Sequence, residues 1–205
     1  LYNGPVNFPV RAISLDLDDT LWPFAPIGDR IERTLHDWFV AHSPVTAEHF
    51  PIEEMRALRE RVFAEFPQHA HDLGLLRRLT IERALRESGS DPTLASAAHA
   101  IFFRERNRVD FYPDAPDALR RIAARVPVAA LSNGNADVHR VGIGQHFCAA
   151  FSATTLGVGK PDPRMFQVGA RAAGAAPEAV LHIGDDAHLD GVGALNAGMQ
   201  MAWVN

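Results

Sequence analysis

Hydrophobic residues follow two different periods along the chain, and each period predicts its own kind of secondary structure. Residues 10–17 are mostly apolar and rich in β-forming types, which predicts a strand covered on both faces. In the next stretch, apolar residues recur every three or four positions, which predicts amphipathic helices. These helices are expected over residues 27–42, 52–66, 73–86 and 91–108. Four such helices in succession predict a helical bundle.

Beyond residue 111 the predicted strands and helices alternate. Short apolar runs predict strands at residues 126–131, within 147–155, at 179–183 and at 199–204. The segments between them predict helices over residues 114–125, 136–141, 162–174 and 188–197. This alternation predicts an α/β fold with a doubly wound, parallel, Rossmann-like sheet, because right-handed crossovers pack each helix against the sheet.

The helical bundle interrupts this sheet between its first and second strands. A crossover unit usually takes about 30 residues, whereas these two strands end near Asp16 and Ser132, 116 positions apart. The sequence therefore predicts a core formed by residues 1–22 and 111–205, with residues 23–110 inserted as a helical cap. The insertion leaves from the carboxyl edge of the sheet, where α/β proteins bind ligands, so we expect the cap to cover Asp16.

Composition narrows the range of functions. Of the 205 residues, 47% are hydrophobic and 22% are charged, and the formal net charge of −5 argues against a nucleic-acid partner. No apolar run approaches the length of about 18 residues that indicates a membrane-spanning helix. The single cysteine, Cys148, cannot form an intrachain disulfide and, among apolar neighbours, is expected to be a buried thiol. We therefore expect a soluble, cytoplasmic protein that is a monomer or a homodimer.

Acidic residues directly follow the first predicted strand. Asp16 and Asp18 stand two positions apart, so on an extended chain their carboxylates leave on the same side. Two such charges 4 Å apart repel by about 4 kcal/mol at an effective dielectric constant near 20. A cation, a proton or a lysine must therefore hold them together, unless the segment is merely a polar exit from the strand.

Polar residues also end the other predicted strands. They are Ser132 and Asn133 after the second strand, Lys160 in the loop after the third, and Asp185 and Asp186 after the fourth. Each could by itself be a turn, a surface lysine or a helix cap. At one edge of a parallel sheet, however, carboxylates, a lysine, a hydroxyl and backbone amides together suit Mg²⁺ and a phosphoryl group.

In their order along the chain, these motifs resemble those of the haloacid dehalogenase-like (HAD) hydrolases. The resemblance covers nearly the whole sequence and implies that Asp16 is a nucleophile and Asp18 a general acid and base. It implies that Ser132 and Asn133 bind the phosphoryl oxygens, and that Lys160 neutralises the phosphate and the nucleophile. The helical insertion resembles the type 1 cap of this family.

The resemblance also implies a Mg²⁺ cofactor and a reaction. It implies that Asp16, Asp18 and Asp185 are metal ligands, with Asp186 and Asp190 in support. The implied activity is hydrolysis of a small phosphorylated metabolite through an aspartyl-phosphate. Residues 18–22, 132–135, 182–186 and 198–200 are further similar to bacterial phosphatases that act on flavin mononucleotide and on the phosphorylated pyrimidine of riboflavin synthesis.

Several other functions remain open at this level. A haloacid dehalogenase of the same fold resembles this chain at its nucleophile, but such enzymes carry Tyr in place of Asp18. A phosphomutase is less well excluded. A response-regulator-like receiver also combines aspartates, a hydroxyl, a lysine and Mg²⁺, but such a switch needs no lid, whereas phosphoryl transfer gains from excluding bulk water.

Specificity for the substrate is expected to come from the cap and the loop beneath it. The candidate side chains are Trp22, Phe24, His71, Asp72, Arg77 and Arg78. Packing between cap and core explains the two aromatic residues equally well, and a solvated helix face would explain the arginines.

Overall fold

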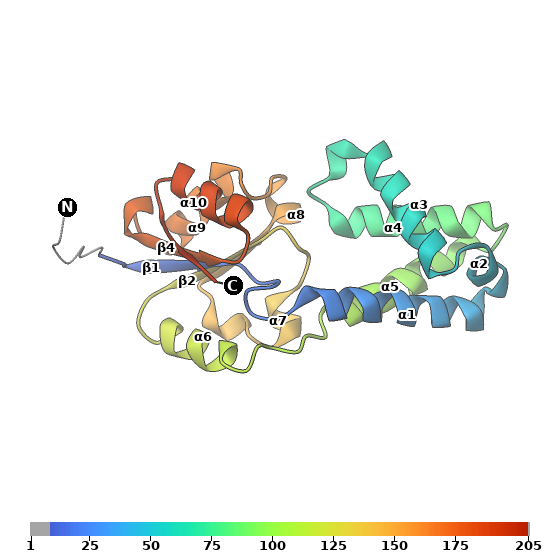
Figure 1. Cartoon of the computed structure of the whole chain (residues 1–205), viewed down its shortest axis with the longest axis horizontal. Coiled ribbons are helices and arrows are strands. Elements are labelled where there is room, and N and C mark those ends of the chain that lie inside the picture. The colour runs from blue at the N-terminus through green and yellow to red at the C-terminus, as the bar shows by residue number, and fades with distance from the viewer. Residues whose placement is uncertain (1–8, 205) are drawn as a thin grey trace.

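The structure is a computed structural model that describes residues 9–204 (Figure 1). Its centre is a parallel sheet of five strands in the order β3-β2-β1-β4-β5. The strands are β1 (Ala12–Leu15), β2 (Val128–Ser132), β3 (Ala149–Ser152), β4 (Val180–Gly184) and β5 (Gln200–Trp203). The predicted doubly wound α/β sheet is therefore confirmed, with the first strand in the middle.

Helices cover both faces of this sheet. On one face, α6 (Ala115–Ala123) and α7 (Val138–Val141) pack over Ile13 and Leu15. On the other face, α9 (Pro163–Ala172) and α10 (Gly193–Asn196) pack over Ala12. Alternate residues of β1 thus enter different hydrophobic clusters, which explains why the strand is apolar throughout.

The helices between β1 and α6 form a separate group beside the sheet (Figure 1). Its helices are α1 (Phe24–His42), α2 (Pro44–His49), α3 (Ile52–Glu65), α4 (Leu73–Glu87) and α5 (Ala95–Arg106). They bury a hydrophobic cluster of their own, which includes Leu35, Phe39, Leu58 and Ile81. All of these helices lie inside the predicted insertion, while its boundaries at residues 23 and 110 stay a prediction. The short helix α2 was not predicted, because six residues are too few to establish a helical period.

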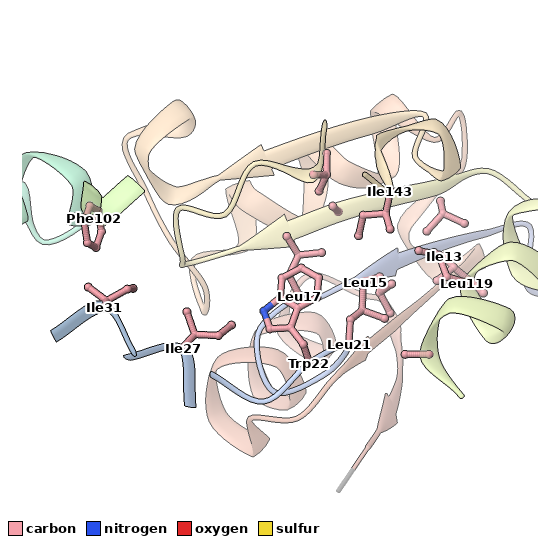
Figure 2. Packing of buried hydrophobic residues seen from close by; sticks show 14 residues of the cluster. Ile13, Leu15, Leu17, Leu21, Trp22, Ile27, Ile31, Phe102, Leu119 and Ile143 are labelled. Carbon is pink, nitrogen blue, oxygen red and sulfur yellow. The ribbon is translucent and has the colours of Figure 1, made fainter. Parts of the chain in front are cut away.

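The hydrophobic cluster around Ile13 and Leu15 continues from the sheet into the cap (Figure 2). Leu17, Leu21 and Trp22 follow β1, and they share this cluster with Ile27 and Ile31 of α1 and with Phe102 of α5. Asp19 turns the chain here with a positive φ of 55°, a conformation that Asp tolerates better than most residues. The two connecting segments, which lead into α1 and out of α5, therefore lie beside the end of β1.

Two details differ from the predictions. Cys148 is exposed, not buried, because β3 is an edge strand and the alternate residues Cys148 and Ala150 face outward there. The predicted helix over residues 188–197 is a π-helical turn, Ala187–Val192, followed by α10.

Within residues 9–204, no helix combines the length and the apolar character that crossing a membrane requires.

Candidate active site

The ends of the central strands bring Asp16, Lys160 and Asp190 together in a buried group. The Nζ atom of Lys160 donates to Oδ1 of Asp16 and, at 2.5 Å, to Oδ1 of Asp190. All three side chains are almost fully buried. Burial disfavours the Lys160 ammonium, but attraction and hydrogen bonds from the two carboxylates outweigh that effect and raise its pKa. Lys160 is therefore a charged member of the site, not a surface lysine.

Asp190 is held from several sides. Its Oδ1 accepts a hydrogen bond from Nε2 of buried His182 at 3.0 Å, and its Oδ2 accepts from the backbone of Asp186 at 3.1 Å. His182 in turn bonds through Nδ1 to the hydroxyl of Ser14. A Cβ atom on Gly184 would lie 2.3 Å from Cγ of Asp190, so only glycine fits at that position. Because both its oxygens have donors, Asp190 suits the supporting role predicted for it.

The electrostatic balance of this group favours the binding of a cation. One carboxylate oxygen each from Asp16, Asp185 and Asp190 lie within 4.8 Å of one another. These three carboxylates face a single lysine, and burial lowers the pKa of His182, which disfavours a second positive charge. Burial also raises the pKa of Asp16, to about 7, and that of Asp185, with the charge of Asp190 adding to both. Two excess negative charges on oxygen ligands fit a divalent cation such as Mg²⁺.

Thr20 and Asp186 arrange the acidic residues of this group. The Thr20 hydroxyl donates to Oδ1 of Asp185 at 3.3 Å and lies 3.5 Å from Oδ2 of Asp16. Asp186 accepts bonds from the backbone of His188 and Leu189 and so caps the π-helical turn. Asp186 therefore orders the loop after β4, whereas its predicted support of the metal ligand Asp185 stays a prediction. The contribution of Thr20 was not predicted.

The Asp18 carboxylate lies outside the three-aspartate group that could bind a metal. Its Oδ1 accepts from Nε1 of Trp22 at 2.8 Å, and its Oδ2 accepts from Nη2 of Arg106 at 2.5 Å. Arg106 is buried at the end of α5 and reaches the core from the cap. The geometry gives no support to the predicted metal contact of the Asp18 side chain. Its other predicted role, in proton transfer, stays a prediction.

Ser132 and Asn133 follow β2 and have different surroundings. The Ser132 hydroxyl is buried and accepts from the Gly134 amide at 3.0 Å, which leaves its own proton available to a ligand. The Asn133 side chain bonds to both backbone groups of Lys160, through Nδ2 at 2.9 Å and Oδ1 at 2.7 Å. Ser132 is thus suited to phosphoryl binding, whereas the Asn133 side chain fixes the lysine loop, so its part in phosphoryl binding would fall to its backbone.

A cavity of about 510 Å³ lies between cap and core beside Asp18. Among the predicted specificity residues, Phe24 and Arg77 line it. Arg106 lines it as well, although no sequence pattern indicated this residue. The other four have structural contacts. Trp22 is buried against Asp18, the His71 carbonyl accepts from Thr154, Asp72 caps α4, and exposed Arg78 pairs with Glu82.

A comparison with known protein families matches this arrangement to one family. The family model for haloacid dehalogenase-like hydrolases matches residues 10–198, a range that contains Asp16, Ser132, Lys160, Asp185 and Asp190. The chain belongs to the haloacid dehalogenase-like hydrolases. The predicted family and the hydrolase class of the enzyme are thereby confirmed.

Individual HAD-like proteins resemble the whole chain. It is 33% identical to 5-amino-6-(5-phospho-D-ribitylamino)uracil phosphatase YigB of Escherichia coli (strain K12), over 95% of this chain and 83% of that protein. It is 30% identical to the phosphoserine phosphatase of Thermus thermophilus, over 96% and 89% of the two chains. A solved structure of 2-haloacid dehalogenase from Pseudomonas syringae pv. Tomato DC3000 has a TM-score of 0.89 and 34% identity, covering 96% and 86%.

Proposed function

We propose that this HAD-like hydrolase is a Mg²⁺-dependent phosphatase that acts on a small phosphorylated metabolite. The observation that carries the proposal is the arrangement at the strand ends, where Lys160 bridges Asp16 and Asp190, and Asp185 adds a further carboxylate. This group offers a nucleophile, a fixed positive charge and excess carboxylates in one place. The phosphatases YigB and phosphoserine phosphatase among the relatives support the same reaction.

In this reaction Asp16 attacks the phosphorus atom, and the bond from phosphorus to the alcohol oxygen breaks. Asp18 donates a proton to the departing alcohol, which leaves an aspartyl-phosphate on Asp16. Water then attacks this phosphorus, Asp18 takes the proton of the water, and Asp16 is released with inorganic phosphate. Asp18 suits both proton transfers because Trp22 and Arg106 hold its carboxylate in a defined orientation beside the cavity.

The surrounding groups stabilise the charge of the phosphoryl group. Lys160 and the Ser132 hydroxyl supply a positive charge and a donor next to Asp16. Asp16 and Asp185 would hold Mg²⁺, which supplies further charge neutralisation at the phosphoryl oxygens when bound. The raised pKa of both carboxylates is the feature of this chain that fits the metal, because a cation would favour their ionised forms.

Haloacid dehalogenation is the second candidate, because the structurally similar Pseudomonas syringae protein is described as a 2-haloacid dehalogenase. That reaction displaces a halide, which needs no proton. The presence of a carboxyl group, that of Asp18, beside the cavity therefore favours a phosphate ester, whose alcohol leaving group needs an acid.

Substrate panels separate the two candidates. The purified protein would be assayed for phosphate release from phosphate monoesters, including 5-amino-6-(5-phospho-D-ribitylamino)uracil and phosphoserine, with Mg²⁺ and with EDTA. Chloride release from 2-chloropropanoate would be measured in parallel. We expect phosphate release that depends on Mg²⁺ and no chloride release. Chloride release without phosphate release would replace the proposal with the dehalogenase function.

A further inference from the structure

The cavity between cap and core contains positive charge whose hydrogen-bonding capacity is only partly used within residues 9–204. Arg106 belongs to its wall, and its Nη1 atom is buried without a hydrogen-bond partner among residues 9–204. Its other nitrogens donate to Asp18 and to Oδ1 of Asn135. The Nδ2 atom of the same Asn135 side chain is also buried without a partner in the described part of the chain. The hydrogen-bonded pair of Arg106 and Asn135 at the cavity wall therefore has two donor nitrogens without a partner.

Half-buried Arg77 of α4 lines the same cavity and also has free donors. Within residues 9–204 it forms no ion pair, and no hydrogen bond of its side chain is found. The nearby carboxylate of Glu32 already accepts hydrogen bonds from Arg56 and Arg59. Burial lowers the pKa of the Arg77 guanidinium to about 10, and repulsion from Arg59 adds to this effect. The protein thus holds a guanidinium in a place where its charge is costly, as expected for a group that a ligand completes.

Both guanidinium groups lie over aromatic rings. The Cζ atom of Arg77 is 5.1 Å from the centre of the Phe102 ring, and that of Arg106 is 5.3 Å from the Phe24 ring. Phe102 and Arg106 are four residues apart on α5, so they share one face of that helix. The rings restrict the guanidinium planes. The edge of Arg77 stays available for a ligand, in the forked geometry that matches pairs of oxygens in one plane, whereas Arg106 retains only its Nη1 atom.

Charged side chains, among them Glu32, Arg56 and Arg59, also line the cavity, and another part of its wall is apolar and suits a carbon skeleton or a ring. Phe63, Leu73 and Ile31 contribute to it, together with the aromatic rings under the arginines. On the core side the cavity reaches Asp18 and Asn133, beside the expected position of the phosphoryl group. A phosphate ester bound at Asp16 would therefore extend its leaving group into this cavity.

We infer that the cavity binds the leaving group of the phosphate ester, and that Arg77 and Arg106 recognise sp² oxygen atoms on it, as in a carboxylate or the carbonyl edge of a ring. This inference rests on the proposed phosphatase function and adds the chemical class of the leaving group. Arg106 contacts Asp18, so its substitution would change chemistry and binding together. Arg77 has no contact with a proposed catalytic side chain and gives the cleaner test.

The test compares esters that differ in these oxygen atoms. One pair is 3-(phosphonooxy)propanoate and propyl phosphate, which isolates a carboxylate. The other is uridine 5′-monophosphate and ribose 5-phosphate, which isolates a ring with carbonyl groups. We expect the wild type to prefer the oxygen-bearing member of at least one pair in kcat/KM. Arg77→Leu and the more polar Arg77→Gln should each reduce this preference by about tenfold or more, the loss expected for a hydrogen bond to a charged group.

Arg78→Leu is the matched control, because Arg78 is the next residue of α4 and its side chain is exposed and paired with Glu82. It should keep the wild-type preference. A wild type that prefers neither oxygen-bearing ester, or Arg77 variants that keep the preference, would overturn the inference.

Binding measurements separate this inference from the proposed function. Isothermal titration calorimetry in the Asp16→Asn background, with Mg²⁺ present, measures affinity for the same esters without turnover. Weaker binding of the oxygen-bearing esters after Arg77→Leu supports the inference even if the wild type hydrolyses none of them, a result that would reject only phosphatase activity. Equal affinities with and without Arg77 would reject the inference even if hydrolysis is rapid.

Discussion

The strand ends of the core and the cavity under the cap hold buried charge in opposite ways. In the core, Lys160 has two carboxylate partners, and Asp190 has donors on both oxygens. In the cap, Arg77 has no ion-pair partner within residues 9–204, and Arg106 keeps one buried nitrogen unpaired. A buried charge is costly unless it is paired. The charged groups at the strand ends therefore already have partners within the protein. In the cap cavity, by contrast, donors are left that a bound ligand can pair with.

This difference assigns separate tasks to the two regions. Substitutions at the strand ends should stop or alter the reaction with every substrate, whereas substitutions in the cavity should change which substrates are used.

Asp16→Asn should reduce phosphatase turnover by about 10⁴-fold or more, because an amide cannot attack phosphorus, and loss of a nucleophile has effects of this size or larger. The amide is nearly isosteric, so circular dichroism should show an intact fold. Steady-state assays with several phosphate monoesters provide the measurement. Near wild-type turnover with any of them would remove Asp16 from the role of nucleophile.

Asp18→Asn should separate the two chemical steps. An alkyl phosphate needs an acid for its poor leaving group, and loss of a general acid typically costs about 10²–10⁴-fold. p-Nitrophenyl phosphate hardly needs the acid, so it should still phosphorylate Asp16 and then stall, because the second step lacks its base. Stopped-flow absorbance should show a burst of p-nitrophenolate that is stoichiometric with enzyme.

Metal binding by the Asp18→Asn variant serves as the control, since a displaced Mg²⁺ would also blunt the burst. If the metal binds and both substrates slow equally without a burst, Asp18 is a structural carboxylate and not the acid and base.

The contrast between core and cap also explains what the sequence could predict. Asp16, Lys160 and Asp185 follow strands of one parallel sheet, and such strands end at the same edge, so their proximity follows from the topology alone. Arg106 stands 88 positions from Asp18, near the C-terminus of a helix, where basic residues are common. Nothing local distinguishes it from exposed Arg104 on the same helix.

Other details depended on the surroundings of single residues. Arg77 and Arg78 are neighbours in sequence, yet one lines the cavity and the other forms a surface pair, a choice set by how α4 packs. Cys148 was expected to be buried from its apolar neighbours, but its exposure depends on β3 being an edge strand. Strand order and helix rotation are tertiary properties, which hydrophobic periodicity does not determine.

Lys160→Ala should destabilise the protein and also lower its activity severely. Because Lys160 is paired with both Asp16 and Asp190, its removal leaves buried carboxylates without compensation, a change that typically costs about 3–5 kcal/mol. Urea unfolding of the metal-free protein measures this loss. Arg164→Ala is the matched control, since it breaks the exposed pair with Asp162 and should cost about 0–1 kcal/mol. An unchanged stability in Lys160→Ala would contradict the buried ion pairs.

The smallest expected effect is a pH dependence of stability that comes from Asp16. Burial raises the folded-state pKa of this carboxyl from 3.8 to about 7, with Asp190 adding to the rise and Lys160 opposing it. Between these two pH values the folded protein binds the proton more tightly than the unfolded chain does. The contribution of Asp16 to stability is therefore most favourable near pH 4, falls as the pH rises toward 7, and is constant above that range.

The difference in melting temperature between the wild type and Asp16→Asn isolates this effect, because the amide does not titrate and the other groups are common to both proteins. In EDTA, the wild type should lose stability relative to Asp16→Asn as the pH rises from 4 to 7. Excess Mg²⁺ should reverse the trend, since a cation bound by Asp16 and Asp185 favours the ionised carboxylates. A difference that does not change with pH in EDTA would show that Lys160 fully compensates Asp16, and it would remove the electrostatic argument for a metal at the strand ends.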